Sequence, residues 1–198
     1  MNEQKIKYLR EGTRKAYSAA AERPLDEHSF PVGAHFAESL GYPRDLLSGL
    51  PSISTGAFSG VSNVSVFADI PVGSVVLDLG CGAGLDSLTA ARRTGAKGRV
   101  IGVDFSDSML ARARQAATID KANNVAFYQA DGENLPIGKA KIDVALVNGI
   151  FNLNPKRDAI FKELARVIRD GGKLYAAELI LKAPLPPEIR ENEIDWFA

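Results

Sequence analysis

Short apolar runs alternate along this chain with longer segments in which apolar residues recur every three or four positions. Val75–Leu79 holds four apolar residues and one acid and is followed by glycine, which is typical of a buried parallel strand. In Leu85–Arg93 the apolar positions fall about one helical turn apart. The pattern predicts a strand, a tight glycine turn and a helix, and the rest of the chain is interpreted around this unit.

The same alternation continues toward the C-terminus. Helices are predicted over residues 106–121 and from 154 to about 169, with Ser106 and Asn154 as their caps and Gly171-Gly172 ending the second. Further strands are predicted at residues 98–104, 124–129, 141–147 and 173–181. Strands that alternate with helices predict an α/β fold with a doubly wound, mostly parallel sheet.

The chain on either side of this core has a different pattern. Residues 3–22 have the spacing of an amphipathic helix that Pro24 ends, and residues 24–72 are irregular except for a short helix near 44–48. The helix is expected either to cover the substrate side as a lid or to pack on the sheet edge. The expected parts are an N-terminal helix with a lid segment, a ligand-binding core, and a stiff linker with a partial helix, at residues 1–72, 73–181 and 182–198.

The composition argues against several kinds of partner and site. The 198 residues contain 24 Lys plus Arg and 24 Asp plus Glu, so the zero net charge gives no electrostatic case for binding nucleic acid or an anionic membrane. No apolar run approaches the ~20 residues of a membrane span, and residues 1–5 lack a signal-peptide core. Cys81 is the one cysteine, which excludes an intrachain disulfide and a cysteine-only metal cage. We expect a cytoplasmic protein without a bound metal.

The glycine turn after the first strand reads Asp-Leu-Gly-Cys-Gly-Ala-Gly over residues 78–84. Glycines allow positive φ and the close approach of a ligand, and the helix that follows presents free N–H groups. The dinucleotide fingerprint would need its third glycine where Leu85 stands, and a P-loop would need a lysine that this turn lacks. An NAD-dependent oxidoreductase is therefore a weaker alternative, and an ordinary tight turn is the simplest one.

Polar residues follow the ends of the other predicted strands. Asp104 stands 20 residues after the last glycine of the turn, where an acid can accept hydrogen bonds from both ribose hydroxyls. It can also cap a helix, but Ser106 is the better cap and would leave Asp104 free. Asp131 and the N–H of Gly132 can recognise an adenine edge or form a common Asp-Gly turn. Together with Asn148, these residues are expected to meet at the carboxyl ends of parallel strands and to bind a nucleoside.

Four stretches carry a resemblance to a known family: VLDLGCGAG, the acid in GVDFS, QADGENLP and ELARVIRDGGKLYAAE. Together they resemble the class I S-adenosylmethionine (SAM) dependent methyltransferases, which have a Rossmann-like fold. The resemblance implies SAM as the cofactor and methyl transfer to a small-molecule acceptor. The resemblance also implies which residues contact each part of SAM. The amino-acid end would contact Asp78, Gly80, Cys81, Gly82 and Gly84, and the methionine part would lie next to Asn148. The ribose would contact Asp104, and the adenine would lie beside Phe105 and Met109 with its edge at Asp131 and Gly132.

A closer likeness lies in GLDSLTAARRTGAKGRVIGVDFSDSMLARAR, NLNPKRDAIFKELARVIRDGGKL and PLPPEIRENEIDWFA. These stretches resemble the arsenite methyltransferases and, next to them, the quinone-biosynthesis C-methyltransferases. Arsenite methylation relies on several cysteine thiolates, whereas this chain has Cys81 alone and has Asn148-Gly149 where that family usually has Asn-Cys. We therefore expect no methylation of arsenite.

The resembled fold continues with a helix and a C-terminal antiparallel hairpin, whereas this sequence stops at Ala198. The hairpin is therefore expected to be missing. An uncovered sheet edge and an exposed Trp196 would favour pairing with another copy. We expect a homodimer or a poorly soluble chain.

Residues for the chemistry are less well marked. His28 and His35 are weak candidates for a general base, because imidazole transfers protons near neutral pH, although loop histidines are commonly plain surface residues. Tyr17 and Phe151 are expected pocket walls, since aromatic faces attract a sulfonium cation. A hydroxyl or carbon acceptor would need a base and a thiolate or amine would not, so both cases stay open. A SAM-binding subunit without catalysis is the alternative from another functional class.

Overall fold

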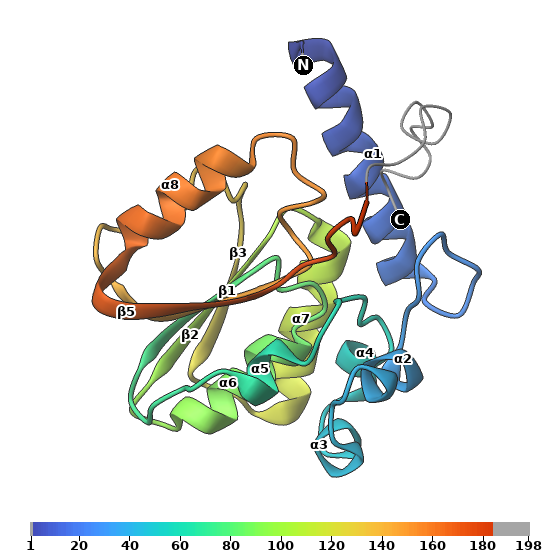
Figure 1. Ribbon diagram of the computed structural model, residues 1–198. Coiled ribbons are helices and arrows are strands. Elements are labelled where there is room, and N and C mark those ends of the chain that lie inside the picture. The colour runs from blue at the N-terminus through green and yellow to red at the C-terminus, as the bar shows by residue number, and fades with distance from the viewer. Residues whose placement is uncertain (1, 184–198) are drawn as a thin grey trace.

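Five parallel strands form the sheet at the centre of this computed structural model, which describes residues 2–183 (Figure 1). Their order across the sheet is β3-β2-β1-β4-β5, and each neighbouring pair is parallel. The predicted fold class is therefore confirmed. The strands are β1 Val75–Leu79, β2 Arg99–Asp104, β3 Val125–Gln129, β4 Ile142–Asn148 and β5 Ile168–Ala177.

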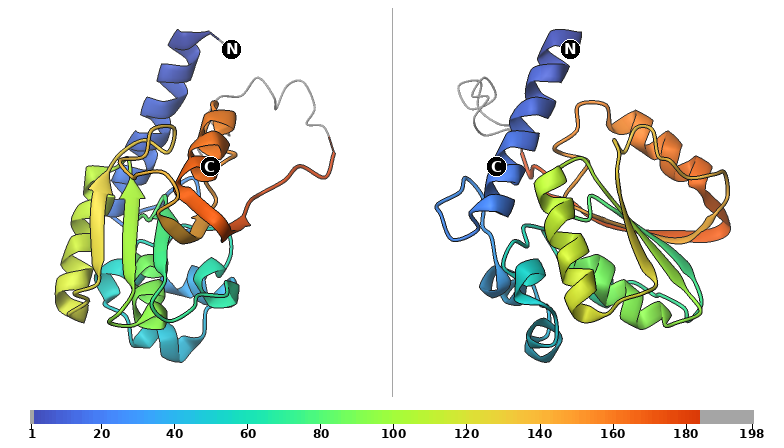
Figure 2. Two further views of the ribbon diagram at one scale, coloured as in Figure 1. Left: turned by 90° about the vertical axis from the view of Figure 1, so that its left-hand side faces the viewer. Right: turned by 180° about the vertical axis from the view of Figure 1, so that it is seen from behind.

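Helices cover both faces of the sheet, as Figure 2 shows. Helices α6 (Leu85–Thr94) and α7 (Asp107–Asp120) lie on one face, and α8 (Arg157–Val167) lies on the other. Successive side chains of β1 serve the two faces in turn, because they point to opposite sides of a strand. Val76 packs in the cluster that contains α6 residues, whereas Leu77 packs in the cluster with the buried side chains of α8. The core therefore has two layers, one on each side of the sheet.

The start of one helix was predicted correctly and the start of another was not. The Met109 N–H donates to the Ser106 hydroxyl at 3.3 Å, so Ser106 caps α7 as expected. Helix α8 was predicted to begin at Asn154, but it begins at Arg157. The Asn154 side chain instead accepts the Lys156 N–H at 2.7 Å, in a turn that precedes the helix.

The passage from α8 into β5 also differs from the prediction. The strand begins at Ile168, directly after the helix, and not at Lys173. Gly171-Gly172, which was expected to end the helix, lies within β5 at a point where the pairing with β4 shifts its register. Gly171 has a φ of +75°, which glycine adopts without strain and which such an irregularity requires. Of the linker predicted from residue 182, residues 182 and 183 are described; the rest of it and the helix predicted after it lie outside the described residues.

Helix α1 (Glu3–Glu22) has the predicted bounds and stands against the carboxyl ends of the strands, on the right in Figure 1. The segment after it holds more helix than predicted, because turns of four to six residues are too short to show a helical repeat. Within the described residues, no helix is both long and apolar enough to cross a bilayer. The short helices are α2 Ala34–Ser39, α3 Arg44–Ser48, α4 Ser52–Thr55 and α5 Val64–Phe67, of which α3 was predicted.

Candidate functional site

Two adjoining cavities lie where β1, β2 and β4 end. Cavity 1, of about 60 Å³, lies against the glycine turn after β1, and cavity 2, of about 70 Å³, lies against the segment after β3. Helix α1 contributes Tyr17 to cavity 1 and Arg10 to cavity 2, so the N-terminal helix covers both. The two cavities form one divided cleft because they share lining residues. The shared residues are Gly80, Asp104, Phe105, Ile150 and Leu153.

The three glycines of the turn have different tasks. Gly80, Gly82 and Gly84 have φ values of +74°, +51° and +89°, which favour glycine. The first two line cavity 1, and a Cβ on Gly80 would lie 2.1 Å from the Cδ1 atom of Ile150. Gly84 is not among the described residues that line either cavity, and a Cβ there would meet Ala113 of α7 at 3.2 Å. Gly80 thus allows Ile150 to approach the turn closely, Gly82 leaves room at the cavity, and Gly84 permits close packing of α7.

Asp104 joins the glycine turn to the start of α7. Its Oδ2 accepts the Gly82 N–H at 2.9 Å, and its Oδ1 accepts the Ser106 N–H at 2.8 Å. The expectation that capping by Ser106 leaves Asp104 free is therefore wrong, although each carboxylate oxygen can accept a further hydrogen bond. Burial raises the pKa of the Asp104 carboxyl, and the backbone N–H donors oppose that rise. The predicted meeting of this acid with the glycine turn is present in the fold.

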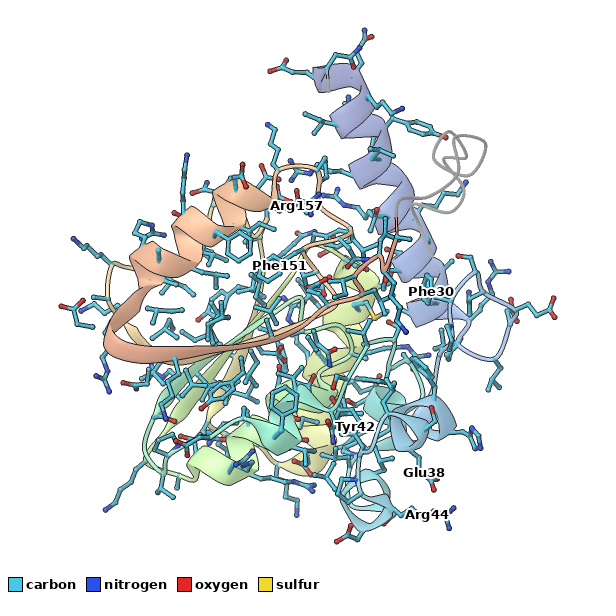
Figure 3. All side chains as sticks on the ribbon, viewed as in Figure 1. Phe30, Glu38, Tyr42, Arg44, Phe151 and Arg157 are labelled. Atoms are coloured by element: carbon cyan, nitrogen blue, oxygen red, sulfur yellow. The ribbon has the colours of Figure 1, made fainter. Side chains whose placement is uncertain are left out.

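Two more carboxyl groups lie at cavity 1. Asp78 accepts the Ser87 hydroxyl at 2.5 Å, and Asp86 accepts the Tyr42 hydroxyl at 2.6 Å (Tyr42 is labelled in Figure 3). Burial first, and then the charge of Asp86, raise the pKa of Asp78 to about 8. Among the described residues that line cavity 1 there is no Lys or Arg. The chemistry of this wall suits a cationic group of a ligand.

Asn148 lines cavity 1, but its amide is used within the protein. The Oδ1 atom accepts the Val61 and Ser62 N–H groups at 2.8 and 3.1 Å. The Nδ2 atom donates to the Ser62 carbonyl at 2.7 Å and to Asp86 at 2.9 Å. A Cβ on Gly60 would lie 2.6 Å from this nitrogen, so the close approach requires glycine. Asn148 therefore holds the loop before α5 against the end of β4, a task that the sequence analysis did not foresee.

Cavity 2 contains the residues expected at an adenine edge. Asp131 and Gly132 line it, and Phe105 lies on the boundary with cavity 1. The guanidinium of Arg10 lies 2.6 Å from the Asp131 carboxylate and 3.4 Å from that of Glu133. In this structure α1 therefore holds the carboxyl group that was expected to meet adenine.

Tyr17 and Phe30 stack at the mouth of cavity 1, with ring centroids 4.4 Å apart (Figure 3 labels Phe30 beside α1). Burial, with the charges of Asp104 and Glu178, raises the pKa of Tyr17 to about 12. The phenol therefore stays protonated at neutral pH and can act as a hydrogen-bond donor.

Phe151 was expected to wall the pocket, and the structure corrects this. The Phe151 side chain, labelled in Figure 3, is buried in the core cluster, and its ring stacks on the exposed Phe161 of α8 at a centroid distance of 4.4 Å. Glu178 accepts the N–H groups of Ile150 and Phe151 at 2.7 and 2.9 Å and so fixes this loop. Ile150 and Leu153 of the same loop line the cavities instead.

Neither histidine lines the cavities in the described part of the chain. His28 Nε2 lies 2.9 Å from the Arg23 carbonyl, and its ring stacks loosely on Phe30. His35 is an exposed residue of α2. The structure gives neither residue a position from which it could take a proton inside the cleft.

Cys81 and Met109 line cavity 1; the resemblance implied Cys81 at the amino-acid end of SAM, whereas Met109 was expected beside the adenine and is not among the described residues that line cavity 2. Both are buried, and burial raises the pKa of the Cys81 thiol well above its ordinary value. Cys81 is therefore a neutral thiol in the wall of the turn.

The sequence analysis expected the N-terminal helix and the segment before β1 to cover the site, but of their residues that line the cavities it named Tyr17 alone. Strand-end rules find residues that follow β-strands, whereas these belong to α1 and to the segment before β1. Asp86 and Ile150 were also missed, because a buried acid in a helix and one apolar loop residue give no pattern. The cavity residues that no motif indicated are Arg10, Thr13, Arg14, Ser54, Ala57, Phe58, Ser59, Gly60, Asp86, Ile150 and Leu153.

Comparison with known proteins bears on this site. A family model described as a methyltransferase domain matches residues 70–196. An arsenite methyltransferase from Halobacterium salinarum is 35% identical over 156 residues, which are 78% of this chain and 39% of that protein. A ubiquinone/menaquinone biosynthesis C-methyltransferase from Azotobacter vinelandii is 38% identical over 109 residues, which are 54% of this chain and 42% of that protein. The chain thus spans about two fifths of the length of these relatives.

Solved structures share the fold. An arsenic(III) S-adenosylmethionine methyltransferase from Chlamydomonas reinhardtii matches with a TM-score of 0.63 and 27% identity, over 83% of this chain and 55% of that one. A SAM dependent methyltransferase from Aquifex aeolicus matches with a TM-score of 0.53 and 22% identity, over 61% of this chain and 65% of that one.

Proposed function

This chain belongs to the class I SAM-dependent methyltransferases, and from that membership we propose that it transfers a methyl group from SAM to a small-molecule acceptor. The observation that carries the proposal is the hydrogen bond of 2.9 Å from the Gly82 N–H to Asp104, at the boundary of the two cavities. A ligand across this boundary would reach the glycine turn at one end and Asp131 at the other. A nucleoside joined to an amino acid is such a two-ended ligand, with the amino acid at the glycine turn and the base at Asp131.

The residues present fit such a ligand in chemistry. The carboxyl groups of Asp86 and Asp104 at cavity 1 suit the ammonium and sulfonium charges, and the Asp78 carboxyl can accept a hydrogen bond from the ammonium. The two cavities, of about 60 and 70 Å³, are smaller than the pockets of ~300 Å³ or more that drug-sized ligands occupy. The cleft therefore has to widen before a ligand of that size can enter. We infer that Ile150, which rests over Gly80, moves aside when the cofactor enters.

When bound, SAM supplies an electrophilic methyl group, so the tasks left to the protein are alignment and the exclusion of water. Tyr17, Ile150 and Leu153 close cavity 1. With its pKa raised to about 12, the Tyr17 hydroxyl would donate a hydrogen bond to the acceptor and would not take its proton.

We propose that the acceptor is small and has apolar faces. Ala57, Phe58 and Leu153 supply apolar surface near the turn. The described lining contains no histidine, so a hydroxyl or acidic carbon would have to give its proton to one of the carboxyl groups at cavity 1, whereas an amine or a thiolate would need no base. The homodimer, the cytoplasmic location and the absence of a nucleic-acid partner stay predictions from the sequence.

Two measurements test the proposed function. Calorimetry should show that SAM and its demethylated product bind and that NAD does not. An assay with labelled SAM across small amines, thiols and phenols should then show methyl transfer. Binding of SAM without transfer to any acceptor would favour the non-catalytic SAM-binding subunit, and binding of NAD alone would overturn the proposal.

We expect that this chain does not methylate arsenite. Soft cations are held by thiolates, and Cys81 is a buried neutral thiol in a chain with one cysteine. The purified chain should be incubated with SAM and arsenite and analysed for methylarsenite, with an arsenite methyltransferase as the positive control. Formation of methylarsenite by this chain would contradict the prediction.

A further inference from the structure

Ser54 has a buried hydroxyl without a hydrogen-bond partner in the structure, and the residue lines cavity 1. Its side chain is fully buried, at 0% exposure. A buried polar group without a partner costs stability, so such a group usually indicates a ligand or another task. Ser65 has a hydroxyl in the same condition but lines neither cavity in the described residues. The two serines therefore form a natural pair for comparison.

The fold holds Ser54 firmly at this place. Its N–H donates to the Pro51 carbonyl at 2.9 Å, so the residue sits in a hydrogen-bonded helical turn. Helix α4 packs on α7, and the next lining residue, Ala57, is buried in a cluster with Ala83 and Met109. Ser54 therefore lies on the α7 side of cavity 1, whose lining also includes Leu85 and Asp86 from the start of α6.

The charges around cavity 1 indicate which part of the ligand Ser54 meets. The amino-acid end of SAM carries an ammonium and a carboxylate. Asp86 and Asp104 suit the ammonium, but in the described lining no Lys or Arg is present for the carboxylate. That group must therefore rely on hydroxyl and backbone N–H donors, such as those at the start of α6.

We propose that the Ser54 hydroxyl donates a hydrogen bond to the α-carboxylate of SAM. This assignment rests on the proposed function. It explains why a hydroxyl without a partner is kept in a fully buried position at cavity 1, and it gives the segment before β1 a part in binding the cofactor.

The experiment compares two variants and two ligands by calorimetry. The variants are Ser54→Ala and the control Ser65→Ala. The ligands are SAM and decarboxylated SAM, which keeps the ammonium and the sulfonium but lacks the carboxylate. Thermal unfolding without ligand checks that both variants fold, and each is expected to be at least as stable as the wild type because it loses an unpaired buried hydroxyl.

Ser54→Ala should weaken SAM binding by about tenfold, because a hydrogen bond to a charged group is lost. It should leave the affinity for decarboxylated SAM unchanged, and Ser65→Ala should leave both affinities unchanged. If Ser54→Ala weakened the binding of both ligands equally, or weakened neither, the assignment would be overturned while the proposed function would stand. Failure of the wild type to bind SAM would overturn both.

Discussion

At the scale of single residues, burial perturbs the pKa of the Asp78 carboxyl beside the cleft. Burial and the charge of Asp86 raise the pKa of Asp78 to about 8, although the Ser87 hydroxyl opposes this rise. In the unfolded chain the same group has a pKa of about 4. The folded state therefore binds a proton that the unfolded state releases between these two values.

This difference sets the direction of a pH effect. A raised pKa contributes stability below about pH 4 that is lost as the pH rises toward 8, so the free energy of unfolding should fall over that range. Asp78→Asn should reduce the slope, because the amide does not ionise. Urea unfolding at several pH values measures the free energy of unfolding and therefore its slope against pH.

Asp69→Asn is the matched control. Asp69 is exposed, and the hydrogen bond from Lys173 lowers its pKa. Its contribution to the free energy of unfolding is therefore lost as the pH falls through this lowered pKa, well below the range from pH 6 to 8. This variant should leave the slope between pH 6 and 8 unchanged. An unchanged slope in Asp78→Asn would contradict the assignment of the effect to Asp78.

Residues of the site were predictable where they follow strands. Gly80, Gly82, Asp104 and Asp131 stand at strand ends, and the parallel sheet brings such positions together whatever the details of packing. Ser54 could not be predicted, because nothing in its neighbours marks a buried hydroxyl without a partner, a condition that exists only once the chain has folded.

At the scale of elements, α1 is tied to the core at its C-terminal half. The hydroxyls of Ser18 and Ser106 lie 2.8 Å apart, and the Ser108 hydroxyl donates to Glu22 at 2.9 Å. Nearer the N-terminus, the helix closes cavity 2 through Arg10, which pairs with Asp131. If the adenine edge meets Asp131, as the resemblance implies, the cofactor and the helix would compete for the same carboxyl group.

Removing that competition should strengthen binding. Arg10→Ala should raise the affinity for SAM about two- to fivefold, which is the range expected when a partly exposed ion pair no longer has to be broken. Calorimetry measures the change. Lys7→Ala, which breaks an exposed pair with Glu11 one turn away on α1, should have no effect. Weaker binding in Arg10→Ala would instead mean that Arg10 contacts the ligand.

Elements were predictable in type and less so in their ends. The strands and long helices follow from apolar spacing, and α7 begins where Ser106 indicated. The boundary between α8 and β5 was missed, because Gly171-Gly172 favours a helix end by its composition, whereas the actual strand starts before it at Ile168. Pairing with β4, which no local pattern reveals, decided that boundary.

At the scale of the whole molecule, one ligand would touch parts of the chain that are far apart in sequence. Residue 17 of α1, residues 54–60 and the ends of β1, β2 and β4 all line cavity 1. Binding should therefore stabilise the N-terminal segment together with the sheet.

The unfolding temperature should report this coupling. SAM at 100 times its dissociation constant adds ~2.7 kcal/mol to the folded state, which corresponds to a rise of about 5–10 °C for a domain of this size. Differential scanning calorimetry measures it, and NAD at the same concentration serves as the control. A similar rise with NAD, or no rise with SAM, would contradict the expected cofactor.

The hydrogen bonds of Asn148 also have a practical consequence for engineering. They hold the chain beyond Gly60 against β4, while Ser54 lies on the helical turn α4. Ala57–Ser59 therefore connects two segments that are each held in place. Ala57 is buried against Ala83 of the glycine turn and Phe58 is buried as well, so Ser59 is the position of the three that can be varied without disturbing that turn. Under the proposed function, substitutions at Ser59 would vary which molecule receives the methyl group without changing the one that donates it.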